Sequence, residues 1–401
     1  MTRDTSGNIP TAASSISSPR ILGLHHVTLV ASNAQRTADF YTRVLGLRLI
    51  KTTVNFDDPG SYHLYFADES GAPGTVVTFF EWPRAPRGRS GIGGTHHVAL
   101  RVGNQNALLR WKRRLTDLGL RVIGPYDRHY FMSIYFRDPD GVLLEIATEG
   151  PGMLVDALAN GVEQRTPPLA LMRGARDEAA IVALTWPEPV MHIDADMSLL
   201  RGMHHLTATT SNLENTDAFL RGVLGMTLVA KTENFDDPGN RHWTWGTPDA
   251  RPGSLITYLE RDAATHRRAN MGTGQGHHYA LAVADDVAQG EFRERLLAAG
   301  LSVSPVMDRV YFKSIYTSDP DGHIVELATM GPGFLIDEPV ETTGTALRLP
   351  PWLEAHRDRI AANLTDLEHA PWPSDGRDAE RGMRSYPERA IAIPDAAEAR
   401  A

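Results

Sequence analysis

Paired histidines and strand carboxylates are the groups in this sequence whose types and spacing could do chemistry. Eight of the sixteen histidines form four adjacent pairs, and each pair opens a largely apolar segment. A glutamate follows 48 residues after His97 and again 48 residues after His278, each time inside an apolar strand sequence. A buried carboxylate is costly unless a positive group meets it, and neutral imidazole is a common metal ligand. The pattern therefore predicts metal sites that include Glu145 and Glu326.

Strand alternation indicates which histidine of each pair is the ligand, because neighbouring strand residues point to opposite faces. In residues 25–30, the apolar side chains of Val27 and Leu29 define the packing face. His26 then lies on the open, concave face, and the other histidine of its pair points toward the helix side. The same reasoning selects the second histidine of the other three pairs, which are His97, His205 and His278.

Two imidazoles and one carboxylate form a facial triad, an arrangement that suits non-haem Fe(II) and leaves three positions open. Alignment of the equivalent strands puts Thr78 and Thr257 where a fourth, acidic ligand would stand. A four-ligand site favours Lewis-acid isomerisation, whereas three open positions can hold a two-oxygen chelating substrate together with O2. The two threonines therefore favour a dioxygenase.

The elements that must position these residues occur four times. Two segments share the sequence NFDDPG, two others share DPDG, and equivalent residues of the two halves lie 179 or 181 positions apart. Each module is predicted to consist of a strand, a helix that ends at a glycine, and three further strands, with Asn33 as the first N-cap. The sequence thus predicts an α+β protein of four βαβββ modules, arranged as two duplicated halves with cupped mixed sheets.

The repeats also suggest boundaries along the chain. Residues 21–153 are predicted to form a first domain with modules one and two, and residues 201–338 a second domain with modules three and four. Residues 1–20 are rich in Ser and Thr and are expected to be a disordered tail rather than a signal peptide. Residues 154–200 are expected to be a linker, and residues 339–401 a docking segment followed by a loose tail.

Composition excludes several kinds of site and of binding partner. The chain has no cysteine, so disulfides, thiolate nucleophiles, zinc fingers and iron–sulfur clusters are excluded. A net charge of −9 without a basic stripe argues against nucleic acid, and no apolar run approaches the ~18 residues of a membrane span. We therefore expect a cytoplasmic protein without a membrane partner, and leave open whether it forms a homo-oligomer.

Several motifs together resemble the vicinal oxygen chelate superfamily, which includes glyoxalases, bleomycin resistance proteins and extradiol dioxygenases. They are HHVTLVASN, NFDDPG, DRVYFKSIY and LPPWLEAHR, and the resemblance covers about residues 22–361. Within the superfamily, the chain is most similar to the dioxygenases that open the rings of hydroquinones and chlorohydroquinones. The resemblance implies Fe(II), or Mn(II) in its place, with O2 as co-substrate and a small aromatic substrate.

The resemblance also implies roles for particular residues. The metal ligands would be His26, His278 and Glu326. The residues around them would be His25, Thr28, His277, Arg309 and Tyr316. Tyr316 and His277 are expected to donate or accept protons near the bound oxygens, and Arg309 to stabilise negative charge. By contrast, the aspartates of NFDDPG are expected to be turn residues, and no role is assigned to His63 or its copy His242.

The sequence departs from this family in the middle modules, where relatives usually lose the ligands. Here His97, His205 and Glu145 are all present, which indicates a second site or a vestige of one. A further grouping within each half is left open, as in catechol-cleaving relatives. It would join His26 to His97 and Glu145, and His205 to His278 and Glu326.

Two other functions remain as alternatives on the same scaffold. One is a glyoxalase-type, metal-dependent isomerase or lyase, against which Thr78 and Thr257 count. The other is a protein that sequesters an aromatic drug, which would need no metal. Two complete sets of ligand residues favour a metal-dependent enzyme over simple sequestration.

Overall fold

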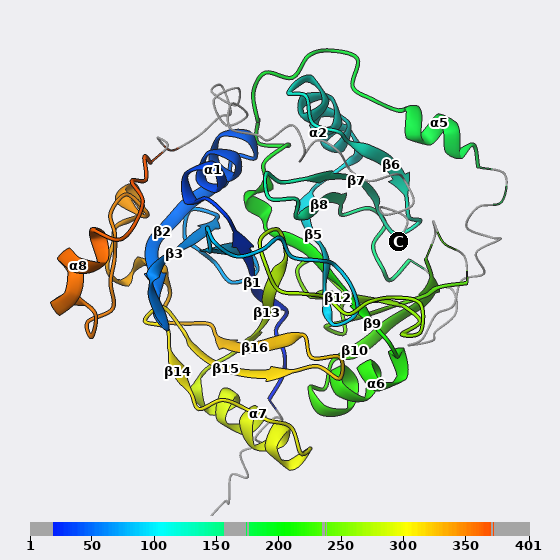
Figure 1. Ribbon diagram of the computed structural model, residues 1–401. Coiled ribbons are helices and arrows are strands. Elements are labelled where there is room, and N and C mark those ends of the chain that lie inside the picture. The colour runs from blue at the N-terminus through cyan, green and yellow to red at the C-terminus, as the bar shows by residue number, and fades with distance from the viewer. Residues whose placement is uncertain are drawn as a thin grey trace, which may run out of the picture.

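The computed structural model of the protein describes residues 19–155, 174, 176–234, 237, 239–369 and 372 (Figure 1). Nearly all of the tail predicted at residues 1–20, part of the predicted linker and most of the predicted loose tail lie outside these residues. The four predicted modules fall within the described residues, apart from positions 235, 236 and 238.

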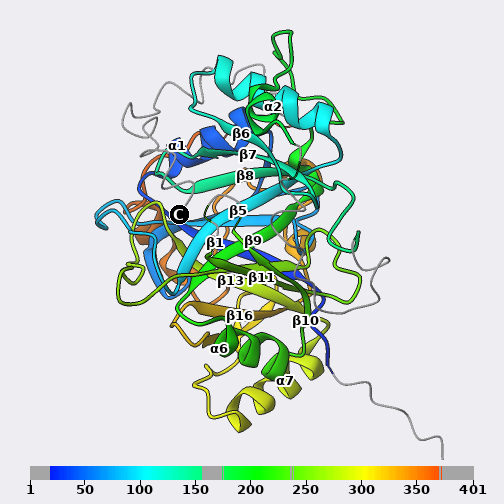
Figure 2. The same ribbon diagram turned by 90° about the vertical axis from the view of Figure 1, so that its right-hand side faces the viewer.

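Two eight-stranded sheets form the body of the protein (Figures 1 and 2). The first sheet has the order β14-β15-β16-β13-β1-β4-β3-β2, and the second has the order β10-β11-β12-β9-β5-β8-β7-β6. Strands of the first sheet are β1 (Leu24–Ala31), β2 (Arg48–Asn55), β3 (Asp58–Ala67), β4 (Val76–Glu81), β13 (Gly276–Val283), β14 (Met307–Asp308), β15 (Lys313–Ser318) and β16 (Ile324–Thr329). Strands of the second sheet are β5 (Gly94–Val102), β6 (Ile123–Asp127), β7 (Met132–Arg137), β8 (Leu143–Thr148), β9 (Met203–Thr210), β10 (Thr227–Glu233), β11 (Arg241–Gly246) and β12 (Leu255–Glu260).

Each sheet takes one module from each half of the sequence. The first and fourth modules join where β1 pairs antiparallel with β13, and the second and third join where β5 pairs antiparallel with β9. Within a module the first and last strands are parallel, as in β1 with β4 and β5 with β8. The predicted α+β fold of four βαβββ modules with mixed sheets is confirmed.

One helix follows the first strand of each module, and two of the four continue into a π-helical turn. These helices are α1 (Ala34–Asp39) with η1 (Phe40–Val44), α2 (Gln105–Asp117), α6 (Leu213–Asp217) with η3 (Ala218–Val223), and α7 (Asp286–Ala298). Asn33 caps α1 as predicted, since its side chain accepts from the Arg36 N–H at 2.8 Å. In both views α1 and α2 lie at one end of the molecule and α6 and α7 at the other (Figures 1 and 2).

Shorter helical segments complete the described structure. They are α5 (Glu178–Ala183), η2 (Leu199–Arg201), η4 (Phe334–Ile336), η5 (Val340–Thr342), η6 (Glu354–His356) and α8 (Arg357–Ala361). Among the helices in the described part of the chain, none has the length and apolar character to cross a membrane. The segment after η4 runs along the edge of the first sheet, where the Arg348 N–H donates to the Thr52 carbonyl of β2 at 2.9 Å.

The two faces of each sheet differ in what they pack against. Val27 and Leu29 are fully buried in the main core, as the strand pattern predicted. Smaller clusters lie on the opposite faces, around Phe312 in the first sheet and around Tyr130 and Met153 in the second. These opposite faces carry the histidines and glutamates of interest.

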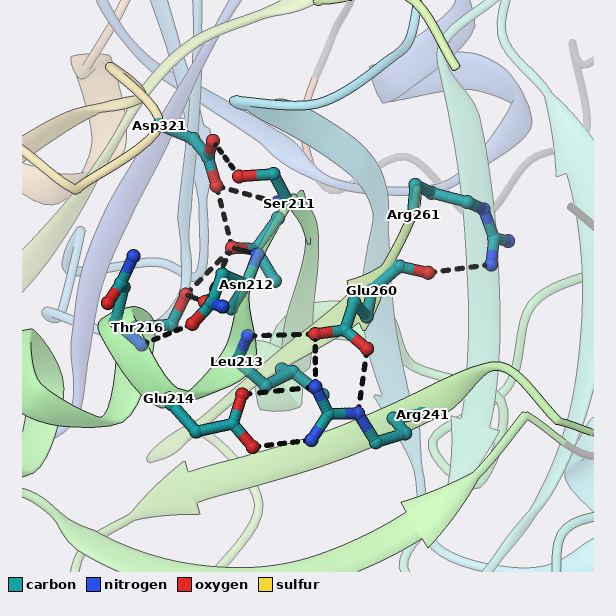
Figure 3. A network of polar contacts seen from close by, with 11 residues as sticks. Ser211, Asn212, Leu213, Glu214, Thr216, Arg241, Glu260, Arg261 and Asp321 are labelled. Atoms are coloured by element: carbon teal, nitrogen blue, oxygen red, sulfur yellow. Dashed lines mark hydrogen bonds and ion pairs between the residues drawn. The ribbon is translucent and has the colours of Figure 1, made fainter. Parts of the chain in front are cut away.

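Turns between strands tie the two sheets together. Asp321, in the turn before β16, accepts from the hydroxyl and the N–H of Ser211, both at 2.7 Å, and from the Thr210 hydroxyl at 2.6 Å (Figure 3). In the matching turn before β8, Asp140 accepts from the N–H of Ser32 at 2.9 Å and from its hydroxyl at 2.5 Å. The duplication seen in the sequence is therefore reproduced in the contacts between sheets.

Candidate metal centres

His26, His278 and Glu326 meet on one face of the first sheet. His26 of β1 pairs with Ala280 of β13, and Ala280 pairs with Glu326 of β16. His278 precedes Ala280 by two residues and so shares its face. The Oε2 atom of Glu326 lies 3.3 Å from His26 Nε2 and 2.8 Å from His278 Nε2, and all three side chains are buried.

His97, His205 and Glu145 meet in the same way on the second sheet. Ala99 of β5 pairs with both His205 of β9 and Glu145 of β8, and His97 precedes Ala99 by two residues. The Oε2 atom of Glu145 lies 2.8 Å from His97 Nε2 and 3.2 Å from His205 Nε2. The two Nε2 atoms are 3.3 Å apart. This group is also buried.

These two groups answer the question of how the predicted ligands assemble. The structure joins the first module to the fourth and the second to the third, and in each group the ligand atoms lie within 4.8 Å of one another. The alternative grouping within each half is not formed, because His26 and His97 belong to different sheets. Each centre therefore takes one histidine from either half of the sequence.

The first histidine of every pair departs from the predicted alternation. We expected it to point to the helix side, but each of the four lies at a β-bulge, either between β1 and β13 or between β5 and β9. The extra residue of a bulge interrupts the alternation of side chains. Both rings of a pair then stand on one side, and His25 and His26 both contact the Phe312 ring, with centroids 4.8 and 5.3 Å away. The four bulge residues are His25, His96, His204 and His277.

Each bulge also brings the two Nδ1 atoms of a pair to 2.7–2.9 Å. His25 Nε2 lies 3.2 Å from the Thr329 carbonyl, which can only accept, so this nitrogen carries the proton. Burial lowers the pKa of His25 to about 3, so the ring is neutral and its Nδ1 must accept from the Nδ1–H of His26. With a cation bound, a singly protonated His26 would therefore present the lone pair of Nε2 to it; without the cation, Nε2 can carry a proton toward Glu326 Oε2, 3.3 Å away.

The threonines stand where the sequence alignment put them and make hydrogen bonds instead of metal contacts. Thr78 pairs with Thr28 in the register of β4 and β1, and its hydroxyl donates to the Thr28 hydroxyl at 2.9 Å. The Thr78 hydroxyl also lies 2.8 Å from His63 Nε2, and the Tyr65 hydroxyl lies 2.9 Å from His63 Nδ1. The buried threonines thus support His63 and Tyr65, which line one side of the first site.

His63 and its copy His242 are site residues to which the sequence assigned no role. The second site repeats the arrangement, because Thr257 Oγ1 lies 2.8 Å from Thr207 Oγ1 and 2.9 Å from His242 Nε2. Burial lowers the pKa of His242 to about 3 and also lowers that of His63, so both rings are neutral. The available signal was their recurrence at one position of both halves, on the strand that follows NFDDPG.

Arg309 and Tyr316 lie on the opposite wall of the first site. Arg309 Nε donates to the Tyr316 hydroxyl at 3.1 Å, and its guanidinium pairs with Asp57 at 3.0 Å. The Tyr316 ring stands edge-on to His278, 5.7 Å between centroids. Burial, and next the charge of Glu326, raise the pKa of Tyr316 above its ordinary value, so the phenol is neutral. Asp57, predicted only as a turn residue, therefore also holds the arginine of the site.

The backbone next to Arg309 has a strained conformation, in the turn that carries Arg309 and Phe312. Val310 has a φ of 68°, which is uncommon for a β-branched residue, and His129 has a φ of 69° at the matching position of the second module. The turn places Arg309 and Phe312 on the same pocket, whose other lining residues include His63, Tyr65 and His277. Arg128 occupies the matching position in the second site, 5.8 Å from the centroid of the Tyr135 ring.

Both centres fit a divalent cation. Burial alone would raise the pKa of Glu326, but His26 and His278 hold it well below its ordinary value, so the carboxylate is charged. Ser314 donates to its Oε1, whereas its Oε2 has no donor among the described residues besides the two ligand rings. Neighbouring ligands of one ion at about 2.1 Å lie about 3 Å apart, close to the spacings found here. Two imidazoles and a carboxylate are also the donors of the facial triad.

Comparison with solved structures agrees with the fold. A crystal structure described as a “putative dioxygenase from Bacillus subtilis subsp. subtilis str. 168” superposes with a TM-score of 0.70 at 30% identity, covering 88% of this chain and all of the other. Glyoxalase I from Zea mays superposes with a TM-score of 0.51 at 15% identity, covering 78% of this chain and 92% of the other. The second likeness is one of fold alone.

Comparison with curated sequences gives the same family. “Putative ring-cleaving dioxygenase MhqO” of Bacillus subtilis is 32% identical over 352 residues, which cover 87% of this chain and 97% of the relative. The chlorohydroquinone/hydroquinone 1,2-dioxygenase of Sphingobium indicum is 29% identical over 86% of this chain and 97% of its own length. The family model matches residues 23–146 and 202–327. The chain therefore belongs to the Glyoxalase/Bleomycin resistance protein/Dioxygenase superfamily, and its relatives in it include ring-cleaving dioxygenases.

Proposed function

We propose that the protein is an Fe(II)-dependent ring-cleaving dioxygenase that inserts O2 into a hydroquinone-type phenolic ring. The observation that carries the proposal is the three-ligand set His26, His278 and Glu326, which opens on a pocket containing both an arginine and a tyrosine hydroxyl. The activities named for the relatives supply the substrate class. Catalysis is assigned to the centre of the first sheet.

Among the described residues no fourth ligand joins the three, and this separates the proposed reaction from isomerisation. Thr78 is engaged by Thr28 and His63, so its hydroxyl is held away from a ligand role. Three coordination positions are then left for a substrate oxygen and O2, as a facial triad provides. A protein that only sequesters an aromatic drug needs no metal, and the buried charge of Glu326 would then be an energetic cost that no bound cation offsets. This also favours the enzyme.

Bound Fe(II) would pass electrons between the phenolic substrate and O2 and would lower the pKa of the substrate hydroxyl. The remaining work falls to side chains of this chain. His277 is neutral, because burial lowers its pKa to about 3, and with its Nδ1 turned to His278 its Nε2–H can donate a hydrogen bond to a substrate oxygen. Tyr316 can return a proton through its hydroxyl, and Arg309 stabilises negative charge that develops on the oxygens.

Aromatic and apolar side chains hold the ring and limit water. Phe80 and Phe312 line the pocket beside the ligands. Phe80 lies 5.2 Å from His277 and 4.3 Å from His63 between ring centroids. A planar phenol placed between these rings would present its hydroxyl to the ligand set and its edge to Tyr316. Both atoms of O2 enter the product, and one carbon–carbon bond of the ring is broken.

The test is oxygen uptake by the full chain loaded with Fe(II) without air and then mixed with hydroquinone in aerated buffer. We expect one O2 consumed per hydroquinone, with loss of the aromatic absorption. The Zn(II)-loaded protein is the matched control and should consume no O2. Equal uptake with Zn(II), or no uptake by protein that holds Fe(II) across a panel of hydroquinones and catechols, would refute the proposal.

A further inference from the structure

The second sheet carries a complete copy of the ligand set and a copy of the histidine contacts that support it. His97, His205 and Glu145 stand at 2.8–3.3 Å from one another, which is as tight as the first set. The bulge histidines His96 and His204 repeat the Nδ1 contacts of the first centre. The His204 ring bonds to the Thr148 backbone, as the His25 ring does to the Thr329 carbonyl. The supports of a metal ligand are therefore intact here as well.

The carboxylate of this centre depends on a cation more than that of the first. Ser314 donates to Glu326 in the first centre, but Ser133, the matching residue on β7, donates to the Tyr135 hydroxyl at 3.4 Å. Apart from the ligand imidazoles, nothing in the described residues donates to either oxygen of Glu145, which is fully buried. A buried charge without donors is strongly destabilising unless a cation meets it. If Glu145 were only a vestige of a metal ligand, its burial in this place would destabilise the fold without a cation to compensate the charge.

The pocket beside the second centre differs in shape from the first. Tyr65 pairs with Thr78 in the first sheet, and the residue that pairs with Thr257 in the second is Thr244. Phe80 pairs with His63, and the residue that pairs with His242 is Leu259. An aromatic ring is thus replaced by a smaller side chain at two positions of the wall. Aliphatic groups take their place in the lining, including those of Met153, Leu255 and Leu259.

We propose that His97, His205 and Glu145 form a second, separately loaded divalent metal centre, whose pocket favours phenols with an apolar substituent over unsubstituted ones. The metal-binding part stands on the geometry of the second sheet alone. The phenolic class of the ligand rests on the proposed function.

Metal analysis of the full-length protein tests the first part. The protein is saturated anaerobically with Co(II), freed of excess metal, and assayed for cobalt per chain. We expect about two ions in the wild type, about one in Glu145→Gln, about one in Glu326→Gln and none in the double variant. Glu81→Gln is the control for folding, because Glu81 is buried outside both centres and accepts from the Ala34 N–H at 2.8 Å. A wild type with one ion that Glu145→Gln does not change would overturn the second centre.

Ligand titration without O2 tests the second part. Glu326→Gln keeps only the second centre and Glu145→Gln only the first, and each is loaded with Co(II) and titrated with hydroquinone and with tert-butylhydroquinone. The visible absorption of Co(II) reports the binding. We expect the second centre to prefer the tert-butyl compound and the first to prefer hydroquinone. One apolar contact shifts such preferences by roughly 10–200-fold.

A single substitution then tests the cause of the preference. Thr244→Tyr in the Glu326→Gln background restores the bulk of Tyr65 and should weaken binding of the tert-butyl compound about tenfold. Equal preferences at the two centres, or a preference that Thr244→Tyr leaves unchanged, would overturn the pocket assignment. None of these measurements involves turnover. A protein that binds two ions and both ligands but consumes no O2 would refute the proposed function without refuting this inference.

Discussion

Tyr316→Phe separates the chemical role of the tyrosine hydroxyl from its structural one. The hydroxyl accepts from Arg309 Nε at 3.1 Å, and the neutral phenol is placed to return a proton to the reacting oxygens. A positioned acid contributes about 10²–10⁴-fold to the rate, which corresponds to roughly 3–5 kcal/mol of barrier. Loss of the buried hydrogen bond costs only about 1–3 kcal/mol of folding stability. Arg309 keeps its ion pair with Asp57 at 3.0 Å, so the arginine stays anchored.

The assay is steady-state oxygen uptake with hydroquinone, together with iron content and thermal unfolding. We expect kcat to fall about 10²–10⁴-fold at unchanged iron content, with a small effect on KM. Tyr279→Phe is the matched control on the opposite face of the same sheet. The Tyr279 hydroxyl is buried and lies 2.9 Å from the Tyr258 hydroxyl, so its loss has a similar structural cost without touching the site.

Two outcomes would refute this reasoning. If Tyr316→Phe kept more than about a tenth of the wild-type kcat, the contribution of the hydroxyl to the rate would be smaller than that of a positioned acid. If Tyr279→Phe lost as much activity as Tyr316→Phe, the effect would reflect general loosening of the sheet. Both variants should unfold at similar temperatures.

Three further predictions concern charge and metal. Asp57→Asn should lower kcat by less than about fivefold, because the Asp57 carboxylate is 59% exposed and exposed ion pairs contribute only ~0.2–1 kcal/mol; oxygen uptake measures this. Burial raises the pKa of Asp138 to about 7. Between about pH 4 and about pH 7 the carboxyl is therefore protonated in the folded chain and ionised in the unfolded chain. The free energy of unfolding should fall as the pH rises through this window. Asp138→Asn should flatten that dependence in thermal unfolding scans across the window. Chelation should lower the unfolding temperature of the loaded protein, since an ion at 100 times its Kd stabilises the fold by about 2.7 kcal/mol; a calorimetric scan with and without chelator checks this, and an unchanged midpoint would contradict it.

The repeats made the fold predictable. Matching NFDDPG and DPDG segments defined four modules, and the apolar alternation around Val27 and Leu29 identified the core face of the first strand. The second histidine of each pair, which the strand alternation selected, lies next to the glutamate of its centre, and its role as a metal ligand stays a prediction. These features depend on the hydrophobic periodicity of single strands and on the similarity between distant segments of the chain. Both can be read from the amino-acid sequence.

Three features were not readable from local sequence patterns. Strand order decides that β1 pairs with β13 rather than with a strand of its own half, and nothing local encodes that choice. A bulge has no fixed sequence signature, so period-two alternation wrongly sent His25 and its three counterparts to the helix side. Asp57 reaches Arg309 across 252 residues of sequence, a contact that only the closed sheet creates.

The bulges and the strand order together explain why the chain is duplicated as it is. Each centre takes its histidines from two antiparallel strands that belong to different halves, β1 with β13 and β5 with β9. The same two seams hold the four bulges, so the residues that set the ligand tautomers also lie where the halves join. A bound ion would connect β1 to β13 and β16, or β5 to β9 and β8, in addition to the backbone hydrogen bonds. Metal binding at these centres would therefore be linked to the association of the two halves, and we expect hydrogen-exchange protection at these seams to fall first when the metal is removed.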